Sequence, residues 1–175
     1  MPKRPVFVTI LSILFGFSAV FLPLVILAMV AMLGSRPVTA ALILIVFAIA
    51  ELCAIFACIG LWRGKAIGWE CAITYYTWSI FFNASKILDV EHGVEMLAAR
   101  GMPADETLVY IRHGTRIAWG SVIIIYLALS PRALAWLGID ERRQWRKAVR
   151  PLLLGLGMFA AQVAAAMTLG GGAAG

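Results

Sequence analysis

Residues 6–33, VFVTILSILFGFSAVFLPLVILAMVAML, form a run of 28 residues without a charged side chain. About 20 consecutive apolar residues in a helix are enough to cross the hydrocarbon core of a bilayer. The run follows Lys3 and Arg4, as a signal peptide would, but a cleavable apolar region has only about 7–15 residues. The stretch therefore predicts an uncleaved first transmembrane helix.

The composition of the whole chain agrees with this first run. Of its 175 residues, 62% are hydrophobic and 14% are charged, and the mean hydropathy is +0.92. A typical soluble domain has about 45–50% apolar and about 25% charged residues. The sequence therefore predicts an all-α fold, a polytopic transmembrane helical bundle that forms a single integral membrane domain over residues 1–175.

Four or five spans are expected in this bundle. After the first span at 6–33, the apolar runs place the others at about 38–62, 66–88, 110–130 and 152–169. The last run opens at Pro151 and is rich in alanine and glycine, so an interfacial or re-entrant segment is the alternative to a fifth span. Between the third and fourth spans, Val90, Val94 and Leu97 recur at helical spacing among charged residues, which predicts an amphipathic outer-loop helix.

Basic residues and tryptophans indicate an orientation. With the N-terminus inside, ten of the 15 Lys and Arg residues fall on the inner side, as the positive-inside rule requires. Four tryptophans fall at the inner interface, namely Trp62, Trp69, Trp136 and Trp145. We expect a multi-pass protein of a bacterial inner membrane with a cytoplasmic N-terminus. The net charge of +6 then serves topology, and no nucleic-acid partner is expected.

Glu51 is the strongest functional candidate, because it lies near the middle of the second span, where a carboxyl group is costly and usually faces the bundle interior. Folding this span onto the third through the 63–65 turn brings Glu51 level with the middle of the third span. Glu51 could carry a proton or bind a cation. Alternatively, a neutral carboxyl group bonds to Tyr75, Thr77 or Ser79 and locks two helices together. The lack of a basic residue at this depth favours the neutral form.

The third span also carries two polar stripes at helical spacing. Their side chains could line a hydrated pocket or a subunit contact, but hydrogen bonding between helices is the simpler interpretation. One stripe consists of Tyr76, Ser79, Asn83 and Lys86, and the other of Glu70, Thr74 and Thr77.

Two charged clusters have weaker candidate roles. Metal-competent side chains repeat on the outer-loop helix at Asp89, His92 and Glu95, with His113 as a candidate fourth partner. Steps of three residues drift around a helix, so we expect a solvated face and no metal site. Anionic lipid head groups could bind the basic residues Arg142, Arg143, Arg146 and Lys147, which would also fix the topology.

No catalytic motif is present, since the sequence has no phosphate-binding loop, nucleophile elbow or zinc pattern. We therefore expect a non-enzymatic protein without a cofactor. Two stretches, GLWRGKAIGW at 60–69 and YLALSPR at 126–132, resemble segments of small uncharacterised four-helix prokaryotic integral membrane proteins. This resemblance implies no activity, cofactor or site, and the apolar run after Arg150 departs from a four-helix pattern.

The expected function is that of an accessory, assembly or scaffold subunit of a membrane complex. Its expected partners are the lipid bilayer and either other membrane subunits or further copies of the chain. The alternative is a small channel or transporter that uses Glu51 to move protons or cations. A third hypothesis is a lipid-binding or lipid-modifying protein that uses the outer loop.

Overall fold

Helices account for nearly all of the structure, a computed structural model that describes residues 3–32, 37–99, 101, 103, 105–140 and 144–171. The all-α prediction is confirmed, because these residues form helices and no strand. The helices are α1 (Val6–Met32), α2 (Pro37–Trp62), α3 (Ala66–Leu88), α4 (Val90–Ala98), α5 (Glu106–Leu129), α6 (Pro131–Trp136) and α7 (Gln144–Gly171).

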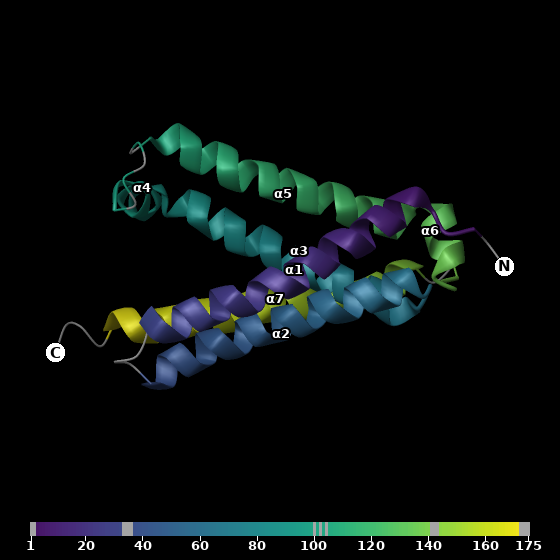
Figure 1. The fold of residues 1–175 in the computed structure, drawn as a ribbon, viewed down its shortest axis with the longest axis horizontal. Helices are drawn as coiled ribbons and strands as arrows, with labels where there is room; N and C mark the ends of the chain where they lie inside the picture. The colour runs from purple at the N-terminus through teal and green to yellow at the C-terminus, as the bar shows by residue number, and fades with distance from the viewer. Residues whose placement is uncertain are drawn as a thin grey trace.

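The long helices α1, α2, α3, α5 and α7 run lengthwise through the molecule (Figure 1). The shortest of them, α3, has 23 residues, which is about 35 Å at 1.5 Å per residue. Within the described residues, Ile43–Trp62 of α2 and Arg146–Met167 of α7 are both long and apolar enough to cross a membrane, and Val6–Val20 of α1 is a shorter apolar stretch. The two longer stretches are consistent with a membrane location.

The last helix begins earlier than the sequence suggested. Pro151 lies inside α7, which starts at Gln144, whereas the last apolar run was expected to open at this proline. A proline within a helix removes one backbone donor. Here the preceding turns are held in place because Ala148 is buried in the hydrophobic core. The exposed Arg146 and Lys147 therefore belong to the first turns of α7.

The predicted amphipathic helix corresponds to α4, which packs against α5. A Cβ atom at Gly93 would lie 3.1 Å from Cγ1 of Val109, so the two helices approach closely at this point. Asp105 caps α5, because its side chain accepts a hydrogen bond of 2.8 Å from the backbone N–H of Thr107. The cap therefore defines the residue at which α5 begins after the loop that follows α4.

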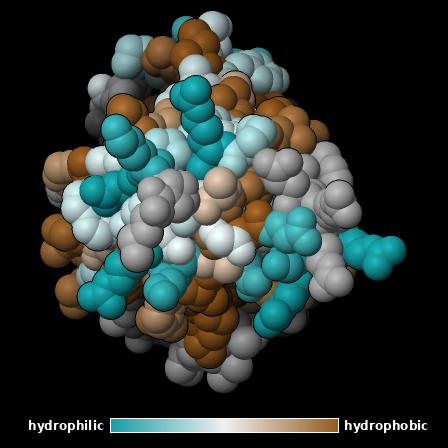
Figure 2. Space-filling model, turned by 90° about the vertical axis from the view of Figure 1, so that its right-hand side faces the viewer, coloured by the Kyte–Doolittle hydropathy of each residue, from teal (hydrophilic) through white to brown (hydrophobic). Residues whose placement is uncertain are grey.

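One end of the molecule gathers the start of α1, the turn between α2 and α3, and α6 (Figure 1). We call it the basic end, after Lys3, Arg4, Arg63, Lys65 and Arg132. Figure 2 faces this end and shows hydrophilic side chains gathered on it. At the opposite end, α4 and the beginning of α5 lie apart from α1, α2 and α7 (Figure 1).

The main hydrophobic core lies in the half of the molecule near the basic end. Helix α3 is central, since α2, α5 and α7 all pack against it. Fully buried members of this core come from five helices, namely Leu11, Phe15, Leu61, Trp69, Ile73, Ile123, Leu127 and Leu134.

Candidate functional site

The register of α2 against α3 is set by two glycines that touch. A Cβ atom on Gly60 would lie 2.5 Å from the Cα atom of Gly68, so a side chain at either position would push the helices apart. Gly64 makes the intervening turn with φ +65°, a conformation that favours glycine. Glu51 lies nine residues before the first glycine of the pair and Thr77 nine residues after the second. The two residues therefore lie at the same level, as the sequence predicted.

Glu51 is buried, with 8% of its surface exposed, and both carboxyl oxygens lack a hydrogen-bond partner among the described residues. The hydroxyl of Thr77 is likewise buried and unpaired within this part of the chain. The predicted hydrogen bond from Glu51 to Tyr75, Thr77 or Ser79 is not formed. Tyr75 instead packs edge-on against the ring of Phe15. Leaving such a polar group unpaired costs about 1–3 kcal/mol.

Helix α7 covers α3 at this level, which the sequence did not indicate. A Cβ atom on Gly155 would lie 2.6 Å from both the carbonyl oxygen of Thr74 and Cβ of Thr77. Further along, the indole N–H of Trp78 donates a 2.9 Å hydrogen bond to Oε1 of Gln162. The glycine allows the two backbones to approach, and the Trp78–Gln162 hydrogen bond links the two helices through polar side chains. Thr77 thus lies at a tight α3–α7 contact, at the same level as Glu51.

The half of α3 that lies farther from the basic end forms a separate polar contact with α5. Asn83 is buried and donates a 2.7 Å hydrogen bond to the carbonyl of Ser79. Its Oδ1 lies 2.8 Å from Nδ1 of His113. Because this amide oxygen can only accept, His113 must donate from Nδ1. One turn further along α3, Nζ of Lys86 lies 5.8 Å from the ring centre of Phe82.

The other members of the two stripes do not converge on one point. Tyr76 packs edge-on against Phe15 of α1. It also lies close to α5, where a Cβ atom on Gly120 would be 3.5 Å from Cδ1 of the Tyr76 ring. Glu70 is only half-buried, whereas Thr74 is buried beneath α7. The polar side chains of α3 therefore face α1, α5 and α7 separately and mostly serve helix packing.

The metal-competent residues of α4 do not assemble into a site. His92 Nδ1 and Glu95 Oε2 are 3.6 Å apart on an exposed face, and Asp89 is the residue that precedes α4. His113 bonds to Asn83 instead of joining them. Across the described residues no group of three His, Cys, Asp or Glu side chains could hold a metal ion.

The predicted lipid-binding cluster is described only in part. Arg146 and Lys147 are exposed at the start of α7. Arg142 and Arg143 lie outside the described residues.

The two stretches that carry the family resemblance pack against each other. The indole N–H of Trp69 donates a 2.8 Å hydrogen bond to the carbonyl of Leu127. That carbonyl has no donor within its own helix, because the residue four positions later is Pro131, which lacks an N–H group. Just beyond the second stretch, the indole N–H of Trp136 donates a 3.0 Å hydrogen bond to the carbonyl of Leu61 in the first stretch. Trp69 is therefore buried in the hydrophobic core, and its ring does not face the surroundings of the protein.

No protein-family model, curated protein or solved structure matches this chain.

Proposed function

We propose that this chain is a multi-pass protein of a bacterial inner membrane that crosses the bilayer five times through α1, α2, α3, α5 and α7. The two long apolar stretches of α2 and α7 support a membrane location. The start of α1 and the end of α7 lie at opposite ends of the molecule, as an odd number of crossings requires (Figure 1). The positive-inside rule places the basic end in the cytoplasm.

We further propose that the protein is a non-enzymatic accessory, assembly or scaffold subunit. One observation carries this proposal: the polar side chains of the helices are largely used in bonds between helices, as in the Asn83–His113 and Trp78–Gln162 pairs. Groups held in this way stiffen the bundle and are not free for chemistry. The outward surface carries large apolar side chains, such as Phe17, Leu52 and Ile125, that suit lipid or another transmembrane helix.

Cross-linking in native membranes, followed by solubilisation in mild detergent, tests this role. We expect the 19.0 kDa chain to migrate in a cross-linked species that contains a second membrane protein or further copies of itself. The same sample without cross-linker, dissolved in a denaturing detergent, should contain only the single chain. Recovery of the single chain alone after cross-linking would contradict the proposal.

A second function, proton or cation movement through Glu51, is favoured by one observation. Both oxygens of this buried carboxyl are unpaired within the described residues, and so is the hydroxyl of Thr77 at the same level of α3. A carboxyl in such surroundings is stable when it holds a proton or faces a cation. Purified protein in proteoliposomes should then show ion flux that Glu51→Gln abolishes. The half-buried Glu70 supplies the control, because Glu70→Gln should leave flux unchanged. Absence of flux in the wild type under proton, sodium and potassium gradients would rule this function out.

A further inference from the structure

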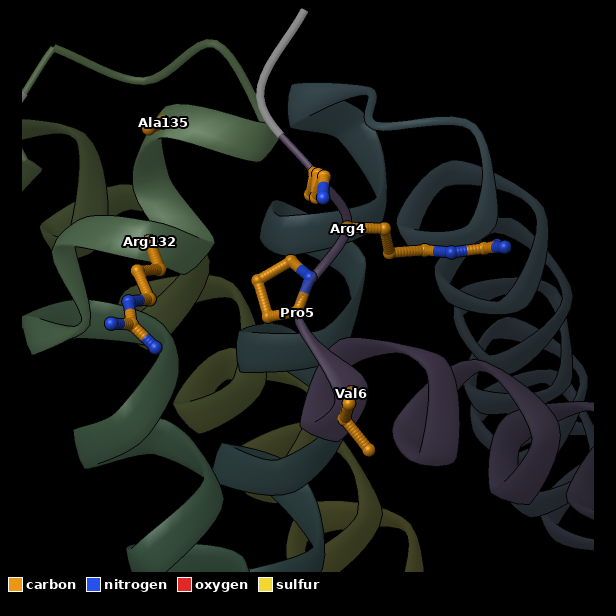
Figure 3. Close-up of a pocket in the computed structure, with 6 residues that line it drawn as sticks. Arg4, Pro5, Val6, Arg132 and Ala135 are labelled. Carbon is orange, nitrogen blue, oxygen red and sulfur yellow. The ribbon is translucent and has the colours of Figure 1, made fainter.

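The basic end carries a hollow between the segment that precedes α1 and helix α6. Its volume is about 470 Å³, and it is lined by Lys3, Arg4, Pro5, Val6, Arg132 and Ala135. Figure 3 shows Arg132 on α6 on one side of Pro5, with the Arg4 side chain extending away on the other side. Half of the lining residues are basic and none is acidic. The hollow is therefore an electropositive site.

Arg4 anchors one wall of this hollow. Its guanidinium carbon lies 3.8 Å from the ring centre of Trp62, and Nη1 donates a 3.4 Å hydrogen bond to the backbone carbonyl of the same tryptophan. A cation stacked on an aromatic face in this way is held by the ring quadrupole. The contacts fix the segment before α1 against the end of α2. The backbone of the wall is thus held in place before any ligand binds.

Lys3 and Arg132 remain free to bind an anion. Both side chains are exposed, and neither forms an ion pair with a carboxylate in the described part of the chain. A guanidinium presents paired N–H donors that match phosphate oxygens, and an ammonium adds a compact point charge. Together they provide the donors that a phosphate group requires.

We propose that this hollow binds the phosphate of an anionic phospholipid head group. The choice of a lipid over free phosphate rests on the proposed membrane location. Apolar Pro5, Val6 and Ala135 complete the lining, and Val6, which is 77% exposed, begins the first apolar run. A lipid bound here would place its phosphate between Lys3 and Arg132 and its acyl chains along the start of α1. Free phosphate would make no use of the apolar wall.

Native mass spectrometry of the full-length protein in mild detergent tests the proposal. Phosphatidylglycerol and phosphatidylcholine are titrated from mixed micelles, and inorganic phosphate is titrated separately. We expect the first phosphatidylglycerol to bind more tightly than either of the others. One basic residue near an anionic head group corresponds to about a fivefold change in affinity. Lys3→Gln and Arg132→Gln should therefore each weaken binding about fivefold, and the double variant about twenty-five-fold.

A matched control removes the same charge from the same end without touching the hollow. Arg63 and Lys65 are exposed in the α2–α3 turn and do not line it, so Arg63→Gln with Lys65→Gln should change the affinity less than about twofold. Circular dichroism verifies that each variant remains helical.

Three results would overturn the proposal. They are an unchanged affinity in the Lys3→Gln, Arg132→Gln double variant, an equal loss in the control pair, and inorganic phosphate binding as tightly as phosphatidylglycerol. Because the titration uses purified protein, its failure would leave the membrane location standing. Recovery of the chain in the soluble fraction of cells would count against the membrane location separately.

Discussion

Replacing Glu51 with methionine is expected to stabilise the folded bundle. Glu51 is buried, with 8% of the residue exposed, and neither carboxyl oxygen has a partner within the described residues. Burying an unpaired polar group costs about 1–3 kcal/mol, and methionine has a similar length and a flexible apolar chain that fills the same space. Glu51→Met should therefore raise the free energy of unfolding by about 1–3 kcal/mol.

Reversible unfolding in mixed micelles, followed by circular dichroism as the fraction of denaturing detergent rises, measures this difference. Glu51→Gln retains an unpaired polar group and should change the free energy of unfolding by less than about 1 kcal/mol. Glu70→Met is the matched control at a half-buried site, where a change within about 0.5 kcal/mol is expected. Destabilisation by Glu51→Met of more than about 1 kcal/mol would refute the reasoning, because it would mean that the carboxyl makes a stabilising contact.

Two further substitutions test the packing that positions Glu51. Gly60→Ala should destabilise the protein by about 1–3 kcal/mol in the same unfolding assay, because its Cβ would lie 2.5 Å from the backbone of α3. The control, Gly157→Ala, has open space around it and should be neutral or slightly stabilising. Equal effects of the two substitutions would contradict the close contact. Trp69→Phe should cost about 1–3 kcal/mol, because it removes the hydrogen bond to the carbonyl of Leu127, and Pro131 has no N–H group to replace it. A change below about 0.5 kcal/mol would show that this bond contributes little.

The arrangement of helices along the chain could be predicted because apolar runs and charged turns alternate clearly. The range predicted for the third span, 66–88, coincides with α3, since Lys65 and Asp89 lie immediately outside it. The start of α7 could not be predicted in the same way. Its first turns carry exposed basic residues, and Pro151 resembles the opening residue of a helix although it lies inside one.

The level of Glu51 could also be predicted, because counting away from a tight turn gives the same depth on both helices of a hairpin. Its hydrogen bonding could not, since this depends on how each side chain is turned about its helix and on where α7 crosses at Gly155. The burial of Trp69 escaped prediction for a related reason. A tryptophan beside a basic turn is typical of a membrane interface, and only the packing of α5 shows that its N–H group serves a carbonyl next to Pro131.

Accessibility of single cysteines tests the proposed membrane topology most directly. In a variant whose three native cysteines are replaced by alanine, Lys65→Cys, Pro103→Cys and a cysteine appended to the C-terminus are each exposed to a membrane-impermeant maleimide in intact spheroplasts. We expect Pro103→Cys and the appended cysteine to react at once, and Lys65→Cys to react only after the membrane is opened. Labelling of Lys65→Cys in intact spheroplasts, or protection of the appended cysteine, would contradict five crossings with the basic end in the cytoplasm.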